Sequence, residues 1–144
     1  MIELSDLTKH RFPWNDGRAF GRNCYWLCRV VYDRLGRSFP EPDELAKAFF
    51  WNADGKANTS AIHAEIETKA MDFFDEILVP EAFSIVSFEM VSPYTSHLGV
   101  VLDPMRFLHA RRLQEDRTRG GVFVERHDCK PWLNRRPRFW RPKG

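Results

Sequence analysis

Three residues of this sequence have side chains that together could carry out nucleophilic catalysis, namely Cys24, His97 and His109. A thiol becomes a strong nucleophile when a neighbouring histidine takes its proton, and a further polar group can orient that histidine. Cys24 directly follows Asn23, a residue type favoured at helix N-caps, and the dipole of a helix stabilises a thiolate in the first turn. The residues alone also allow a plainer interpretation, in which Cys24 is a small apolar residue that begins a buried stripe.

A helix over residues 23–36 is predicted to position Cys24. Apolar residues recur there at the spacing of a single helix face, and they are Cys24, Leu27, Cys28, Val31 and Leu35. Gly36 tolerates the left-handed backbone that ends many helices. The pattern therefore places Cys24 at the helix terminus and buries Cys28 one turn further along.

The two histidines are predicted to face each other across a β-hairpin. Residues 97–102 and 106–111 have strand-like composition, and residues 103–105 form a tight turn between them. A turn centred on Asp103 places His97 directly opposite His109, where Cβ atoms lie about 4.5–5.5 Å apart. Two alternatives stay open at this point. The pair could simply fill a half-buried surface, or Cys24, Cys28, His97 and His109 could bind zinc, although two cysteines four residues apart on a helix are unusual for such a site.

The rest of the pattern predicts an α+β protein whose N-terminal helices, including the helix of Cys24, pack on an antiparallel β-sheet. Residues 1–22 are expected to be irregular, and His63 is expected to be at the surface or hydrogen-bonded. No linker divides the chain, so residues 1–144 are expected to form a single domain. The expected helices span residues 43–51 and 60–77, and the expected strands, besides the hairpin, span residues 83–89, 122–125 and 139–141.

Composition excludes several classes of protein. No apolar run approaches the ~20 residues that span a bilayer, and the N-terminus does not resemble a signal peptide, so we expect synthesis in the cytoplasm. Three cysteines argue against a disulfide framework, and a net charge of +2 is too small to indicate nucleic-acid binding. Residues 130–144 are basic and aromatic and contain no acid. They could meet an anionic polymer or a partner protein, but a packed final strand with solvated arginines is the more common arrangement.

Three stretches carry a resemblance to a known family. Residues 23–27 read Asn-Cys-Tyr-Trp-Leu, residues 96–102 read Ser-His-Leu-Gly-Val-Val-Leu, and residues 107–110 read Phe-Leu-His-Ala. In these stretches the chain resembles the NlpC-type cell-wall cysteine peptidases, specifically the branch found in phage tail tips and gene-transfer-agent particles. That family shows Asp-Cys-Trp/Ser-Gly-Leu-Val on a helix, then His-Val-Gly-Val-Tyr-Leu and Phe-Ile/Leu-His-Ala on strands.

The resemblance implies a papain-like fold with Cys24 as nucleophile, His97 as base and His109 as the third polar member. It implies hydrolysis of peptidoglycan stem peptides without a cofactor, in a phage or phage-derived tail with other tail proteins as partners. A structural tail-tip protein with the same fold is the alternative. The family's oxyanion tyrosine has no counterpart here, so the oxyanion is expected to rely on the backbone N–H of Cys24 and on the helix terminus.

Overall fold

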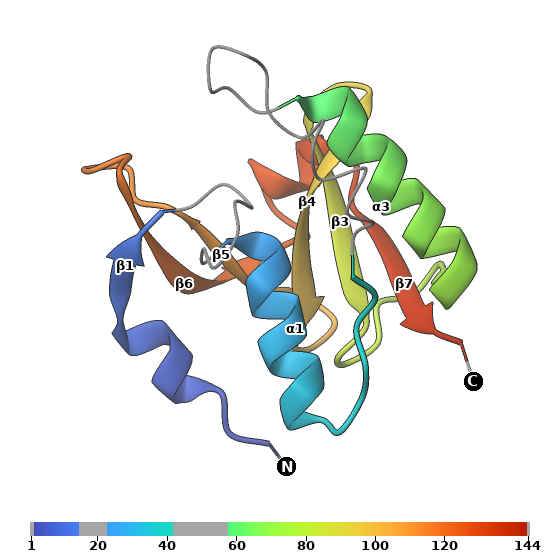
Figure 1. Ribbon diagram of the computed structural model, residues 1–144, viewed down its shortest axis with the longest axis horizontal. Helices are drawn as coiled ribbons and strands as arrows, with labels where there is room; N and C mark the ends of the chain where they lie inside the picture. Colours follow the sequence, from blue (N-terminus) through green and yellow to red (C-terminus); the bar gives the residue numbers. More distant parts are fainter. Residues whose placement is uncertain (1, 15–22, 42–57, 144) are drawn as a thin grey trace.

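The computed structural model describes residues 2–14, 23–41 and 58–143 of the chain (Figure 1). Within these residues, seven strands form one antiparallel sheet in the order β1-β6-β5-β4-β3-β7-β2. The strands are β1 (Arg11–Pro13), β2 (Phe74–Ile77), β3 (Ile85–Val91), β4 (Tyr94–Val101), β5 (Arg106–Arg112), β6 (Arg119–Arg126) and β7 (Arg138–Pro142). Two α-helices, α1 (Cys24–Arg34) and α3 (Thr59–Phe73), and two short 3₁₀ segments, η1 (Ser5–Lys9) and η2 (Trp132–Arg135), complete the described part. The expected α+β class is confirmed, while the expected helix over residues 43–51 lies outside the described residues.

Helix α1 begins and ends where its capping residues predict. The Asn23 side chain accepts a hydrogen bond from the backbone N–H of Trp26 at 2.9 Å. At the other end Gly36 has a φ of +72°, and the N–H of Arg37 donates to the carbonyl of Tyr32 at 2.9 Å. The predicted helix is therefore confirmed.

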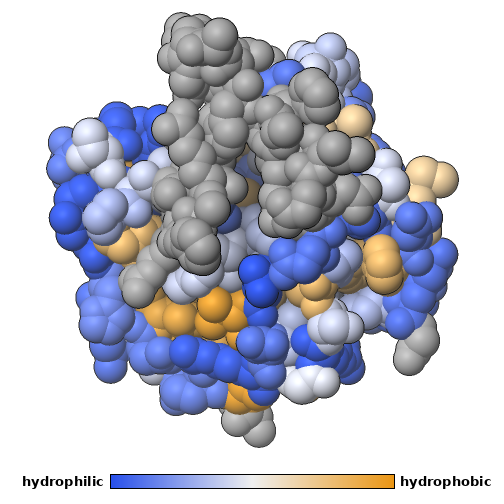
Figure 2. Space-filling view, viewed as in Figure 1, coloured by the Kyte–Doolittle hydropathy of each residue, from blue (hydrophilic) through white to orange (hydrophobic). Residues whose placement is uncertain are grey.

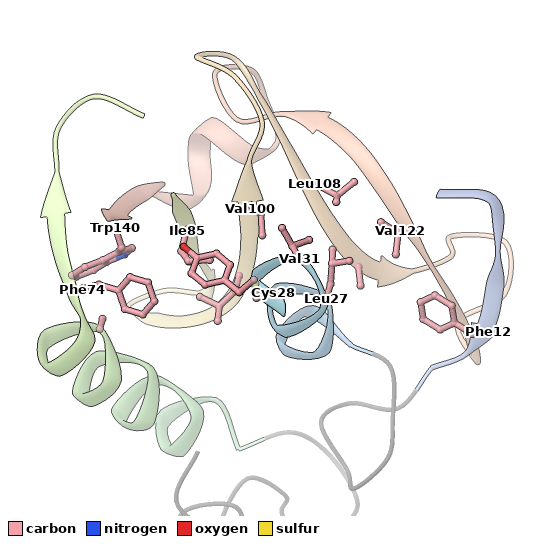
Figure 3. Packing of buried hydrophobic residues seen from close by; sticks show 14 residues of the cluster. Phe12, Leu27, Cys28, Val31, Phe74, Ile85, Val100, Leu108, Val122 and Trp140 are labelled. Atoms are coloured by element: carbon pink, nitrogen blue, oxygen red, sulfur yellow. The ribbon is translucent and has the colours of Figure 1, made fainter. Parts of the chain in front are cut away.

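Side chains alternate between two apolar layers on opposite faces of the sheet. The first layer lies between the sheet and the helices α1 and α3, and Figure 3 shows Leu27, Cys28 and Val31 of α1 facing Val100 and Leu108. The second layer lies on the other face, under η2, and is formed by Val86, Phe88, Val101, Phe107 and Trp132. Because successive side chains of a strand point to opposite faces, neighbouring residues of β4 and β5 belong to different layers.

Long-range pairing changes three of the predicted elements. Helix α3 ends at Phe73, and Phe74–Ile77 pairs with β7 as strand β2, so the expected helix over 60–77 was wrong in its last turn. Residues 1–22 were expected to be irregular, yet Arg11–Pro13 pairs with β6. The hairpin strand expected over residues 97–102 begins three residues earlier, at Tyr94. In each case a partner strand distant in sequence supplies hydrogen bonds that local propensity does not reveal.

The basic C-terminal stretch forms part of the sheet. Strand β7 lies between β3 and β2, and its arginines pair with acids instead of remaining unpaired. Arg138 contacts Glu67 at 2.9 Å and Glu76 at 3.0 Å, and Arg141 contacts Glu81 at 3.1 Å. The interpretation as a packed final strand is confirmed.

The two described α-helices differ from membrane-spanning helices in length and hydropathy. Neither α1 nor α3 is long and apolar enough to cross a bilayer. Among the coloured residues of Figure 2, hydrophilic ones cover most of the visible face, and the hydrophobic ones gather in small patches.

Candidate active site

A buried pair of histidines joins β4 and β5. Nε2 of His97 lies 2.8 Å from Nδ1 of His109, within hydrogen-bond distance, and the two rings meet edge to face. His97 is 7% exposed and His109 is completely buried. The contact predicted from the hairpin is therefore present.

The register of the hairpin differs from the prediction. The pairs Val100–Leu108 and Val101–Phe107 place His109 opposite Gly99, and the turn is centred on Pro104 instead of Asp103. The Asp103 carboxylate accepts from the backbone N–H groups of Met105 at 2.9 Å and Arg106 at 2.8 Å. The backbone N–H of Leu102 donates to the carbonyl of Arg106 at 2.9 Å and closes a turn over residues 103–105, so the centre lies one residue later than expected.

Gly99 allows the histidines to meet diagonally. A Cβ atom at Gly99 would lie 2.8 Å from the Phe107 side chain and 3.3 Å from Cβ of His109. The absence of a side chain there leaves room between His97 and His109, which are two positions out of direct opposition. Diagonal neighbours of this kind are within reach of aromatic side chains.

Trp132 covers the histidine pair on the side away from α1. Its ring stacks on His97 at 5.4 Å between centroids and packs edge to face against His109 at 4.8 Å. Burial, then the charges of His109, Arg135 and Arg111, hold the pKa of His97 well below its ordinary value. Burial also lowers the pKa of His109, against the opposing effect of a neighbouring carboxylate. Both imidazoles are therefore neutral at pH 7.

That carboxylate belongs to Glu125 of β6, a residue to which the sequence analysis gave no role. Glu125 Oε2 forms a short hydrogen bond with Nε2 of His109, and Nε of Arg111 lies 3.3 Å from the same oxygen. The pairing of β5 with β6 places Glu125 opposite Phe107, diagonal to His109. The sequence did show an acid at the end of the predicted strand 122–125. Assigning that acid to the site required knowledge of the β5–β6 register.

Cys24 lies at the start of α1, on the other side of the sheet. It is the first residue of α1, it is half-buried, and α1 packs against β4 and β5 (Figure 1). Leu98 and Val100 of β4 lie in the layer beneath α1, whereas His97 packs with Trp132 on the opposite face. Helix α1 and the ring of His97 therefore lie on opposite faces of the sheet.

The backbone pairing between β4 and β5 is short. Only two residue pairs, Val100–Leu108 and Val101–Phe107, join these strands, and both lie next to the turn. Beyond Gly99 and His109 the two strands are no longer paired. The structure thus brings His97 and His109 together and places Cys24 on the helix that covers the same two strands.

The zinc alternative depends on four ligands that the described residues do not gather. Within residues 2–14, 23–41 and 58–143, no group of three or more His, Cys, Asp or Glu side chains is placed to hold a metal ion. Cys28 is fully buried in the layer beneath α1, and His97 and His109 direct their facing nitrogens at each other. His63, expected to be at the surface or hydrogen-bonded, accepts from the N–H of Thr95 at 2.8 Å, which confirms that expectation.

Comparison of the chain with models of known protein families finds no match. Comparison with curated proteins likewise finds none.

Alkylation should distinguish the three thiols. We expect iodoacetamide near neutral pH to label Cys24 before Cys28, because Cys28 is 0% exposed, and burial followed by the charge of Cys24 raises its pKa well above the ordinary value. Cys129 is exposed and serves as an internal reference for an accessible thiol. Mass spectrometry of a time course gives the order, and labelling of Cys28 ahead of Cys24 would refute the assignment of Cys24 as nucleophile.

Acid should destabilise the fold through its neutral histidines. His97 stays neutral when folded, whereas the unfolded residue takes up a proton below about pH 6.5, so the unfolded state binds more protons. Stability should therefore be retained above that pH and fall as pH decreases from about 6.5 toward the lower pKa of the folded state. His97→Gln should reduce the slope by up to about 1.4 kcal/mol per pH unit, the value for one proton. Urea titrations at pH values from about 5 to about 7 measure this slope.

Proposed function

We propose that this protein is a papain-like cysteine hydrolase that cleaves peptide bonds in bacterial peptidoglycan, carried by a phage or a phage-derived tail. The observation that carries the proposal is the 2.8 Å contact between His97 and His109 beneath Trp132. A buried imidazole oriented by a second imidazole is suited to accept a proton and return it. The motifs at residues 23–27, 96–102 and 107–110, which resemble those of the cell-wall peptidases, supply the substrate class.

In the proposed reaction, His97 takes the proton of the Cys24 thiol, and the thiolate attacks the carbonyl carbon of the scissile peptide bond. The developing oxyanion is stabilised by the backbone N–H of Cys24 and the N-terminus of α1. Collapse of the tetrahedral intermediate breaks the C–N bond, and the leaving amine takes the proton from His97. Water activated by His97 then hydrolyses the thioester and regenerates the thiol.

This reaction uses one particular nitrogen of His97. Because Nε2 faces His109, Nδ1 is the nitrogen that remains for the Cys24 thiol. The transfer requires the thiol to meet Nδ1 where β4 and β5 are unpaired. This proximity can be tested in a His97→Cys variant that keeps Cys24. A disulfide or a short cross-link between residues 24 and 97 would demonstrate it.

The deciding experiment is turnover of purified peptidoglycan. Wild-type protein should release soluble peptides with new amino termini, and a metal chelator should leave the rate unchanged. Release of sugar fragments without new amino termini would overturn the proposed bond. A complete absence of products, with the protein folded and Cys24 reduced, would overturn the hydrolase proposal for that substrate.

A second candidate, a structural tail-tip protein with the same fold, is favoured by one observation. Large apolar residues are exposed at the end of α3 and just after the edge strand β2, and they are Met71, Phe73, Leu78 and Val79. Leu78 is 95% exposed, and an apolar cluster at a sheet edge is typical of a protein contact. On this candidate function, Leu78→Ser with Val79→Ser should block particle assembly, while Cys24→Ala with His97→Ala should allow assembly and infection. Deletion of residues 130–144 is no test of docking, because it removes the internal strand β7.

A further inference from the structure

The hydrogen bonds of the site continue beyond the histidine pair and end in a charged group. His97 contacts His109 through Nε2 and Nδ1, and His109 contacts Glu125 through its own Nε2. Glu125 lies between this contact and the guanidinium of Arg111, whose Nε is 3.3 Å away. Three strands, β4, β5 and β6, thus contribute one continuous chain of polar groups.

The chemistry of the terminal group determines the direction of every bond in this chain. An ionised carboxylate only accepts hydrogen bonds, so Nε2 of His109 must carry the proton. A neutral His109 protonated at Nε2 has a lone pair at Nδ1, which then accepts from Nε2–H of His97. A neutral His97 protonated at Nε2 in turn has its lone pair at Nδ1.

We infer that Glu125, held by Arg111, is a positioning residue that fixes His97 and His109 in their Nε2–H tautomers and so leaves Nδ1 of His97 as the basic nitrogen. The inference deepens the proposed function, because Nδ1 is the nitrogen assigned to the Cys24 thiol. It makes no use of a bound substrate and concerns only groups in contact with one another.

The charges around the chain of hydrogen bonds from His97 to Glu125 favour this arrangement. Burial raises the pKa of Glu125, but the hydrogen bond donated by His109 and the positive charge of Arg111 outweigh burial and hold that pKa below its ordinary value. Burial disfavours a cationic His97, and the charges of Arg135 of η2 and Arg111 of β5 disfavour it further. An ionised carboxylate beside two neutral imidazoles is therefore the stable state near neutral pH.

Nitrogen NMR of the wild-type protein tests the inference directly. Two-bond ¹H–¹⁵N correlation spectra of histidine-labelled protein at pH 7 distinguish a protonated ring nitrogen from one with a lone pair. His97→Gln and His109→Gln assign the signals. We expect both residues to be Nε2–H tautomers, with Nδ1 of His97 unprotonated. A proton on Nδ1 of His97, or a doubly protonated His109, would overturn the inference.

Variants of Glu125 test whether the carboxylate is responsible. Glu125→Gln can either accept or donate, and Glu125→Leu can do neither, so each should lower the ratio of Nε2–H to Nδ1–H tautomer at His97, by roughly tenfold or more in the leucine variant. Glu115→Gln, an exposed acid in the β5–β6 connection, is the matched control and should change nothing. Unchanged tautomers in folded Glu125→Leu would assign Glu125 a merely structural role and overturn the inference. Correct tautomers in a protein that fails to cleave peptidoglycan would count against the proposed function alone.

Discussion

Replacement of Cys24 by alanine should abolish turnover of peptidoglycan, with a loss in kcat on the order of 10⁶-fold. The loss is this large because the covalent pathway disappears entirely, and water cannot use the proton acceptor at His97 in the same geometry. The fold should be preserved, since Cys24 is only half-buried and Asn23 continues to cap α1. Release of peptides, quantified by mass spectrometry alongside thermal melting, measures both effects.

The other two cysteines provide matched controls. Cys129→Ser removes an exposed thiol outside the site and should retain full activity. Cys28→Ala removes a fully buried thiol and should lower the melting temperature, with a smaller effect on kcat than Cys24→Ala. Wild-type turnover by Cys24→Ala would reject the nucleophile, and an inactive but fully folded Cys129→Ser would point to a different thiol.

Replacement of His97 by alanine should remove nearly all turnover, whereas His109→Asn should retain a measurable part. His97 is the proton acceptor in the proposed reaction, so no other group replaces it. Asn Oδ1 can still accept from Nε2–H of His97, as Nδ1 of His109 does at 2.8 Å, although it no longer connects to Glu125. Loss of an orienting group in a catalytic triad costs up to ~10⁴-fold when the wrong tautomer results.

A comparison of two substitutions at position 109 gives a sharper test of the hydrogen bond between the histidines. His109→Asn should exceed His109→Ala in kcat, with both variants assayed at equal folded fraction because His109 is completely buried. His10→Ala, at an exposed position, controls for the loss of a histidine as such. Equal activity of His109→Asn and His109→Ala would show that the hydrogen bond accepted from Nε2–H of His97 contributes nothing to turnover. Substantial turnover by His97→Ala would show that another group is the base.

Local patterns alone predicted the elements whose stability arises from near neighbours. Helix α1, with its N-cap Asn23 and its stop at Gly36, follows from side-chain spacing and backbone preference, which act within a few residues. The hairpin that brings His97 to His109 follows in the same way from two strand-like runs and a turn. Its register did not follow, because the turn is centred on Pro104, where the Asp103 carboxylate accepts from the N–H groups of Met105 and Arg106.

Only the tertiary structure decided which groups surround the histidines. Glu125 and Trp132 come from segments after the hairpin, and their places depend on the pairing of β6 with β5 and on the position of η2 under the sheet. The change from α3 to β2 at Phe74 similarly depends on β7, more than sixty residues later.

The sequence by itself determined that Cys24 lies at a helix terminus and that His97 contacts His109. The spacing of side chains along helices and strands, and the capping of helices, depend on residues close together in the sequence. The sequence did not determine that α1 and the histidines pack on opposite faces of the sheet. The physical reason is that alternation along a strand predicts which residues share a face, but not which helix covers that face. Only burial of apolar area between distant segments selects the covering helix, and that selection is made when the whole sheet assembles.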